Sequence, residues 1–276
     1  MRIVGVAGSG RGLGAHDHLC WIYDHADELF TTAVEFLADG VAQGQRVGYL
    51  GHLGRERMTA ELGRLTADHP GDRPAFAQDL SDWYRSDGII SPGDQIDTYA
   101  VAMADAIRSG YTGLRVVADC TDLVGTSAGR EAFARYEHLI DRRMTSTPLS
   151  GMCAYDRATL GERAADELAC LHPVSNRPDT FGVFAIDQET VGLRGELDGA
   201  VRPQLVRALT RVSFPHGTVV VDATEARFLD QHALGALAGV ARHRGRPVVL
   251  RTSSPAHVRL TRILGITDLV RVELVA

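Results

Sequence analysis

Two histidines and a cysteine alternate along one short stretch near the start of the chain, at His16, His18 and Cys20. Imidazole and thiolate groups are common ligands of zinc. In an extended segment alternate side chains share one face, so these three would converge. The candidates for a fourth ligand are Cys120, Cys153 and His138. A strand with a buried cysteine and a half-exposed histidine explains the same spacing, and the sequence leaves both interpretations open.

A second stretch with chemical potential lies near the end of the chain. Residues 219–222 predict a buried strand, and a short turn then leads through Asp230, Gln231 and His232 into a helix. A helix start has unpaired N–H groups and a partial positive charge. Asp230 therefore caps this helix or belongs to a surface that docks a partner. Neither Gln231 nor His232 has a hydroxyl group that a serine/threonine kinase could phosphorylate.

Composition excludes several classes of function. The 276 residues have a net charge of −6, which disfavours nucleic acid as a partner. All 29 basic residues are arginine, so neither a lysine Schiff base nor a P-loop lysine is available. The four cysteines form no CxxC pair, as expected of free thiols in the cytoplasm. The first 14 residues contain a short apolar patch but no apolar region of signal-peptide length, and the sequence has no apolar run of about 18 residues, so we expect no membrane association.

Hydrophobic periodicity predicts alternating helices and strands in the first part of the chain. The predicted helices are residues 27–41, 55–65, 96–108, 129–143 and 157–170. The predicted strands are residues 46–50, 114–118 and 150–155. Residues 1–14 are glycine-rich and are expected to form a flexible lead-in, and residues 68–74 a turn. This alternation is typical of a doubly wound α/β domain with a parallel sheet.

A second, smaller α/β domain is predicted at residues 181–276. Residues 171–180 contain two prolines and mark the boundary, which leaves residues 1–173 as the first domain. The second domain opens with paired strands at 181–186 and 191–194. The later strands are 218–222, 247–251 and 269–274, and the helices are 200–212, 232–244 and 255–264.

Residues 181–276 resemble the STAS domain of anti-sigma factor antagonists. The resemblance is carried by GELD at 195–198, VVVD at 219–222, FLDQHAL at 228–234 and PAHVRLTRIL at 255–264. In that family a helix start after an aspartate presents Ser or Thr to an anti-sigma factor that is also a kinase. Asp230 is similar to the family's aspartate, whereas Gln231 and His232 replace the hydroxyl residues. The resemblance implies docking to an anti-sigma factor or a related regulatory protein without Ser/Thr phospho-switching.

The first domain resembles the MEDS domain, a sensory domain of methanogens and methylotrophs. The matching motifs are HLCWIYD at 18–24, DWY at 82–84, GYTGLRV at 110–116, YE at 136–137 and CAYD at 153–156. This resemblance implies a RecA/KaiC-like fold without a P-loop that senses small organic molecules. No GxxxxGK[ST] motif occurs, and the glycine-rich residues 8–14 lack the lysine of a phosphate-binding loop.

A ligand of this domain is expected at the carboxyl ends of the parallel strands, where Asp119 and Tyr155 end two strands. The candidate ligand-binding residues are His18, Cys20, Tyr23, Trp83, Tyr84, Asp119, Glu137 and Tyr155. His18 can titrate and Cys20 can be oxidised, which would allow pH or redox sensing. Ordinary packing of Trp83 and Tyr84, and a solvated Glu137, are the alternative interpretations.

These features together predict a cytoplasmic signalling protein and not an enzyme. The first domain would bind a small organic effector, and the second would dock its partner through Asp230, Gln231 and His232. The alternative is a metal- or thiol-dependent enzyme built on His16, His18 and Cys20. A homodimer is compatible with the sequence, which names no cofactor, effector or partner.

Overall fold

The computed structural model describes residues 2–68, 75–84, 89–212 and 218–275. The chain divides into two compact units, Met1–Pro178 and Asp179–Ala276, and each is described here by itself. The turn predicted at residues 68–74 lies almost wholly outside the described residues.

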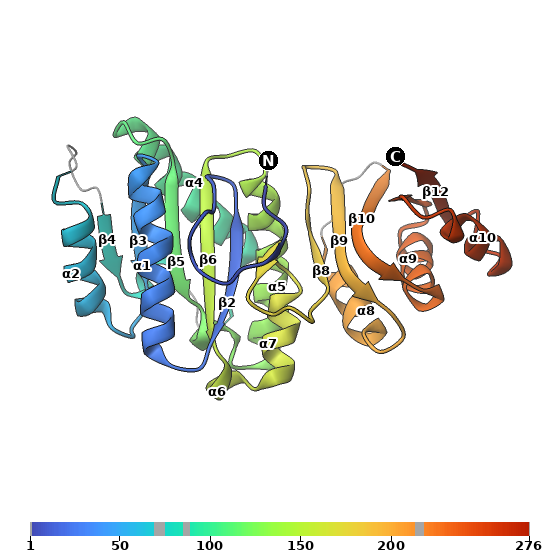
Figure 1. Cartoon of the computed structure of the whole chain (residues 1–276), viewed down its shortest axis with the longest axis horizontal. Helices are drawn as coiled ribbons and strands as arrows, with labels where there is room; N and C mark the ends of the chain where they lie inside the picture. Colours follow the sequence, from blue (N-terminus) through green and yellow to red (C-terminus); the bar gives the residue numbers. More distant parts are fainter. Residues whose placement is uncertain (1, 69–74, 85–88, 213–217, 276) are drawn as a thin grey trace. The chain divides into compact units, whose positions relative to one another are not determined.

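Among the described residues of the first unit, seven strands form one sheet in the order β1-β7-β2-β6-β5-β3-β4, and every neighbouring pair is parallel (Figure 1). The strands are β1 (Gly5–Val6), β2 (His18–Tyr23), β3 (Arg46–Leu50), β4 (Ala75–Gln78), β5 (Leu114–Asp119), β6 (Leu149–Asp156) and β7 (Val174–Ser175). The central strands are buried on both faces, which explains their apolar runs. The predicted parallel α/β fold is confirmed.

Helices cover both faces of this sheet and create two hydrophobic cores. One core lies under α1 (Ala26–Ala42) and α2 (Arg55–Leu65). The other lies under α4 (Pro92–Arg108), α5 (Ser127–Met144) and α7 (Glu162–Ala169). The short helices are α3 (Leu80–Trp83), the 3-10 turn η1 (Thr121–Val124) and α6 (Arg157–Leu160).

The end of the first unit differs from its prediction in two ways. The single helix expected at 157–170 is two helices, α6 and α7, because Gly161 between them has a φ of +79°, which is incompatible with a continuous helix. The segment expected to be a linker is partly structured, since Val174 and Ser175 pair with both β1 and β2. Arg177 also contacts Asp166, so the first unit continues to Pro178.

The glycine-rich lead-in, expected to be flexible, is bound to the fold. The amide of Gly10 donates to Glu35 at 3.2 Å, and the amide of Gly12 donates to Asp39 at 2.6 Å. These N–H groups therefore face the protein's own carboxylates. A bound phosphate would be repelled by those charges, in agreement with the missing lysine.

Among the described residues, the second unit contains a five-stranded sheet in the order β12-β11-β10-β9-β8 (Figure 1). Its strands are β8 (Gly182–Ala185), β9 (Thr190–Leu197), β10 (Val219–Leu229), β11 (Val248–Thr252) and β12 (Val270–Leu274). Its helices are α8 (Arg202–Arg211), α9 (Gln231–Arg244) and α10 (Ala256–Ile263). β8 and β9 are antiparallel and the other pairs are parallel, so the predicted hairpin is confirmed.

Strand β10 is longer than predicted, and the expected turn after residue 222 is mostly strand. Residues 225–229 pair with β9, up to the pair Leu229 and Leu197, with irregular register on both sides of Glu225 and Ala226. These irregularities break the period-two pattern that identifies a strand in sequence. As a result Asp230 lies directly between the end of β10 and the start of α9.

No helix in the described part of the chain is both long enough and apolar enough to cross a bilayer.

Candidate functional site

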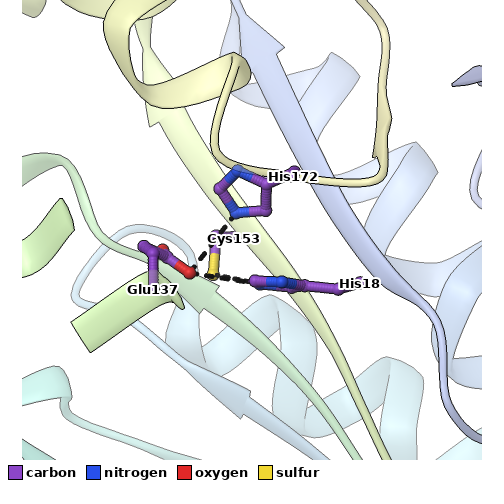
Figure 2. Close-up of side chains that lie close together, drawn as sticks. All are labelled: His18, Glu137, Cys153 and His172. Atoms are coloured by element: carbon purple, nitrogen blue, oxygen red, sulfur yellow. Dashed lines mark hydrogen bonds and ion pairs between the residues drawn. The ribbon is translucent and has the colours of Figure 1, made fainter. Parts of the chain in front are cut away.

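Four side chains from remote parts of the first unit converge in its interior (Figure 2). His18 begins β2, Glu137 lies within α5, Cys153 lies within β6, and His172 lies between α7 and β7. All four are buried, and one ligand atom of each lies within 4.8 Å of the others. Imidazole, thiol and carboxylate groups together form a donor set typical of transition-metal sites.

One carboxylate oxygen of Glu137 contacts both histidines of this group. Its Oε2 atom lies 3.2 Å from Nε2 of His18 and 3.4 Å from Nε2 of His172. The Sγ atom of Cys153 lies 3.6 Å from the same nitrogen of His18. Two imidazole nitrogens, one sulfur and one carboxylate oxygen thus lie within 4.8 Å of one another.

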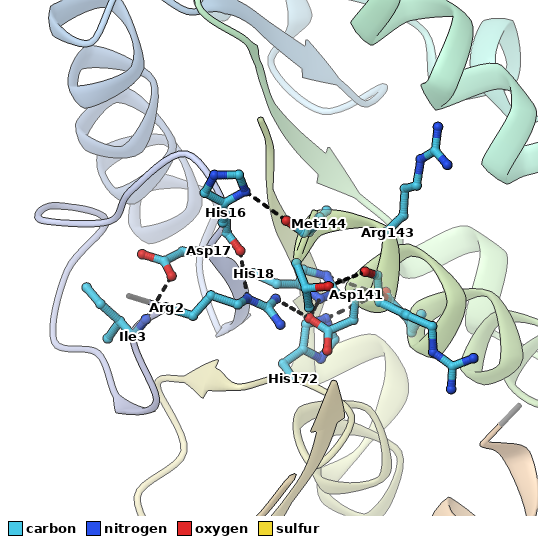
Figure 3. A network of polar contacts seen from close by, with 12 residues as sticks. Arg2, Ile3, His16, Asp17, His18, Asp141, Arg143, Met144 and His172 are labelled. Atoms are coloured by element: carbon cyan, nitrogen blue, oxygen red, sulfur yellow. Dashed lines mark hydrogen bonds and ion pairs between the residues drawn. The ribbon is translucent and has the colours of Figure 1, made fainter. Parts of the chain in front are cut away.

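The orientation of His18 is set by a second carboxylate. Its Nδ1 atom lies 3.1 Å from Oδ1 of Asp141, one turn after Glu137 on α5. Asp141 in turn forms an ion pair with the guanidinium group of Arg2, near the start of the chain (Figure 3). A carboxylate on the far nitrogen of a histidine is the usual outer support of a metal-binding imidazole.

His172 and Glu137 are also oriented by hydrogen-bond partners outside the group. The Nδ1 atom of His172 faces the carbonyl oxygen of Leu168 at 3.0 Å. The hydroxyl of Tyr155 donates to Oε1 of Glu137 at 2.7 Å. These contacts occupy the outward atoms and leave Nε2 of His172 and Oε2 of Glu137 directed at the centre.

Burial and charge pairing shift the pKa values of His18, Glu137 and Asp141 in opposite directions. Burial alone would lower the pKa of His18, but Asp141, Cys153 and Glu137 raise it well above its usual value. Burial would raise the pKa values of both carboxyl groups, but His172 and His18 lower that of Glu137, and Arg2 and His18 lower that of Asp141. For His172, burial and then the charge of His18 lower the pKa. The first unit therefore keeps two buried carboxylates ionised.

The three residues first considered as metal ligands are not brought together. The Nδ1 atom of His16 faces the carbonyl oxygens of Met144 and Thr147, at 2.9 Å and 2.8 Å, at the end of α5. Cys20 lies two residues beyond His18 on the same face of β2, within the hydrophobic core. Only His18 of this set belongs to the convergent group.

Among the three candidates for a fourth ligand, only Cys153 lies in the group. His138 is buried, but its Nε2 atom faces Arg142 at 3.3 Å. Cys120 is buried beside Cys153, and burial raises its pKa. His172 was not predicted, because Pro173 and Pro178 made its segment resemble a linker. The absence of charge from residues 168–175 was a usable signal of burial.

The sheet itself separates the predicted ligand-binding residues into two groups. Tyr23 and Asp119 lie on the α1 face, at the carboxyl ends of β2 and β5, and the tyrosine hydroxyl donates to the aspartate at 3.0 Å. Burial raises the pKa of Asp119. The other six residues lie on the opposite side of the sheet, where α4 and α5 pack. They are His18, Cys20, Trp83, Tyr84, Glu137 (itself part of α5) and Tyr155. The eight residues therefore do not surround one crevice, because successive strand residues point to opposite faces.

Three tyrosines line the interior next to the polar group. The hydroxyl of Tyr84 lies 2.9 Å from that of Tyr99 and 3.4 Å from that of Tyr136. The adjoining cavity, which His18 and Cys153 also line, has a volume of about 10 Å³ and fits about one water molecule. Trp83 is partly exposed and packs against Tyr99, with ring centroids 5.3 Å apart.

In the second unit, the predicted docking residues lie at the exposed start of α9. Oδ1 of Asp230 accepts from the amides of His232 at 2.7 Å and Ala233 at 3.1 Å, so Asp230 is the N-cap. Gln231 and His232 are exposed. Phe228, which was not predicted, is 54% exposed at the end of β10. A large apolar side chain beside a polar helix start is a common feature of protein-binding surfaces.

The fold and the matching family models together define a two-domain regulatory protein, with a parallel α/β sensory domain followed by a smaller STAS domain. The chain belongs to the MEDS family: residues 17–173, more than half its length, match the model described as the MEthanogen/methylotroph, DcmR Sensory domain. Residues 184–272 match the model described as Mlab, STAS domain. Both resemblances seen in the sequence are confirmed, in the same order. The search of curated proteins gave no match.

Proposed function

We propose that this protein is a cytoplasmic signalling component that senses a small molecule or a redox state through its MEDS domain. Its STAS domain would dock an anti-sigma factor or a related regulatory protein. The order of a sensory and a STAS domain in one chain supports this proposal.

The observation that carries the docking proposal is the exposed surface at the start of α9. Asp230 accepts hydrogen bonds from the amides of His232 and Ala233, and this fixes the backbone at the start of the helix. Phe228 adds an exposed apolar side chain nearby in the chain. Such a surface binds a partner by shape and hydrogen bonding, and it requires no phosphoryl group.

Sensing is proposed for the interior that faces α4 and α5. The existing cavity holds about one water molecule, so an organic effector must displace side chains in order to bind. Trp83 is a partly exposed aromatic residue packed against this core, and Tyr84 lines the cavity. Movement of these aromatic residues would report binding as a change in tryptophan fluorescence. Oxidation of Cys20 is the proposed redox alternative.

Docking without phosphorylation can be tested with the anti-sigma factors of the same genome. Each purified factor is mixed with the full chain, and complex formation and transfer of radioactive phosphate from ATP are measured in parallel. We expect a complex with at least one factor and no label on residues 228–234. Strong labelling of that segment would overturn the proposal, and a second STAS protein with serine at the switch position serves as the positive control.

A further inference from the structure

The contact between His172 and Glu137 brings two acceptor atoms together. A carbonyl oxygen only accepts hydrogen bonds, so the contact of Nδ1 with Leu168 places the proton of a neutral His172 ring on Nδ1. Nε2 then carries a lone pair, and it lies 3.4 Å from Oε2 of Glu137. Both atoms are buried, and within the described residues neither has an assigned hydrogen bond, although Nε2 of His18 also lies 3.2 Å from Oε2. A proton on Nε2 of His172 or a metal ion would relieve the repulsion between these two lone pairs.

Protonation of both His18 and His172 would be energetically unfavourable. The rings of His18 and His172 have centroids 4.2 Å apart and no exposed surface. Two imidazolium charges at this distance would repel each other strongly in a buried site. A metal ion binds both nitrogens through their lone pairs, so it satisfies the two rings at once.

The distances between the ligand atoms agree with a tetrahedral site. Bonds of about 2.0–2.1 Å to nitrogen or oxygen and about 2.3 Å to sulfur give edges of about 3.3 Å and 3.6 Å respectively. The contacts of Glu137 with the two histidines are 3.2 Å and 3.4 Å. The contact of Cys153 with His18 is 3.6 Å. These three distances are close to the edges of a tetrahedral zinc site, and the other pairs of ligand atoms lie within 4.8 Å.

We propose that His18, Glu137, Cys153 and His172 bind one divalent transition-metal ion of the zinc class. A thiolate and two imidazoles select such an ion over magnesium or calcium. Four protein ligands complete its coordination, so the ion has a structural and not a catalytic role. Binding would displace the thiol proton of Cys153 and the second ring proton of His18 to solvent, so the buried charge stays balanced.

The ion would connect elements that are far apart in sequence. Its ligands come from β2, α5, β6 and the segment that precedes β7, so it would attach the end of the first unit to the central strands. Asp141, the Leu168 carbonyl and Tyr155 would orient the ligands from outside. This inference concerns the first unit alone and does not depend on docking by the second.

The site can be tested on the full chain, expressed without a histidine tag and purified without chelator. Metal content is measured by mass spectrometry, and cobalt(II) then replaces the native ion for absorption spectroscopy. We expect about one metal ion per chain and a thiolate-to-cobalt charge-transfer band. Cys153→Ser should abolish this band and His172→Gln should alter the visible cobalt bands. Cys20→Ser and His16→Gln serve as matched controls that keep both.

Two results would overturn the proposal. One is a folded wild-type chain that retains no ion after incubation with zinc or cobalt followed by gel filtration. The other is a charge-transfer band that survives Cys153→Ser or is lost in Cys20→Ser. Circular dichroism identifies variants that do not fold. Should Cys153→Ser fail to fold, the visible bands of His172→Gln decide, and unchanged bands in that variant would refute the site.

Discussion

The hydroxyl of Tyr155 donates a 2.7 Å hydrogen bond to Oε1 of Glu137, and both side chains are fully buried. Tyr155→Phe removes this donor and leaves a buried carboxylate oxygen unsatisfied. We expect the first unit to lose about 1–3 kcal/mol of unfolding free energy. Both tryptophans lie in the first unit, so urea unfolding followed by tryptophan fluorescence, with EDTA present, measures this loss.

The matched control for this variant is Tyr136→Phe. The hydroxyl of Tyr136 lies 3.4 Å from that of Tyr84. This distance is 0.7 Å longer than the hydrogen bond from Tyr155 to Glu137. We expect a smaller loss of stability in the control. Equal losses in the two variants would show that the hydrogen bond to Glu137 has no special importance.

The close approach of Gly10 to helix α1 provides a second prediction. A Cβ atom on Gly10 would lie 2.3 Å from the carbonyl oxygen of Thr32, so Gly10→Ala must displace backbone. We expect this variant to lose at least about 2 kcal/mol of stability, as overpacked sites do. Gly8→Ala, two residues earlier, meets no atom within 4 Å and should be neutral. A neutral Gly10→Ala would mean that the lead-in is not packed on α1.

Capping of α9 by Asp230 can be separated from docking. Asp230→Ala removes the acceptor of two amide hydrogen bonds and should destabilise the helix start by about 1 kcal/mol. Asp230→Asn keeps an acceptor oxygen and should retain most of that stability. Hydrogen exchange of residues 231–244, measured by mass spectrometry, distinguishes the two variants. Equal exchange in both would contradict the capping role.

The second unit should become less stable in mildly acidic solution because of His257. This histidine is buried, with Nε2 3.1 Å from the Leu229 carbonyl and Nδ1 2.9 Å from the Thr252 hydroxyl. Burial lowers its pKa, so between the folded value and about 6.5 the unfolded chain binds a proton that the folded chain does not. The stability that His257 contributes is thus complete above pH 6.5 and is lost as the pH falls.

Global hydrogen exchange of the second unit, corrected for intrinsic rates, measures this pH dependence. We expect His257→Gln to flatten the slope between pH 7 and pH 5. His243→Gln, a change at an exposed histidine of the same unit, should leave it unchanged. A slope that persists in His257→Gln would assign the effect to another group.

Local elements of the fold were predictable because short-range periodicity determines them. The predicted strand 46–50 and helix 55–65 coincide with β3 and α2. The prediction failed where tertiary contacts decide the outcome. The amides of Gly10 and Gly12 are bound by carboxylates of α1, and β10 extends past residue 222 because its residues pair with β9.

The candidate site was predictable only in part. His18, Glu137 and Cys153 were all named from the sequence, His18 and Glu137 among the ligand-binding residues and Cys153 as a possible fourth metal ligand beside His18. Their convergence depends on contacts that span 119 residues from His18 to Glu137, 135 from His18 to Cys153 and 35 from Glu137 to His172, which no spacing rule covers. Strand alternation could have separated Tyr23 from Cys20 in advance, since odd and even positions of β2 face opposite cores.

Docking at the start of α9 is tested most directly by the affinity of the full chain for the anti-sigma factor that it binds. The variant with both Gln231→Glu and His232→Glu adds charge at this surface, and Gln188→Glu on the β8–β9 hairpin is the control. We expect the double variant to bind at least about tenfold more weakly, with the control unchanged. Equal affinity of the wild type and the double variant would contradict docking at this surface.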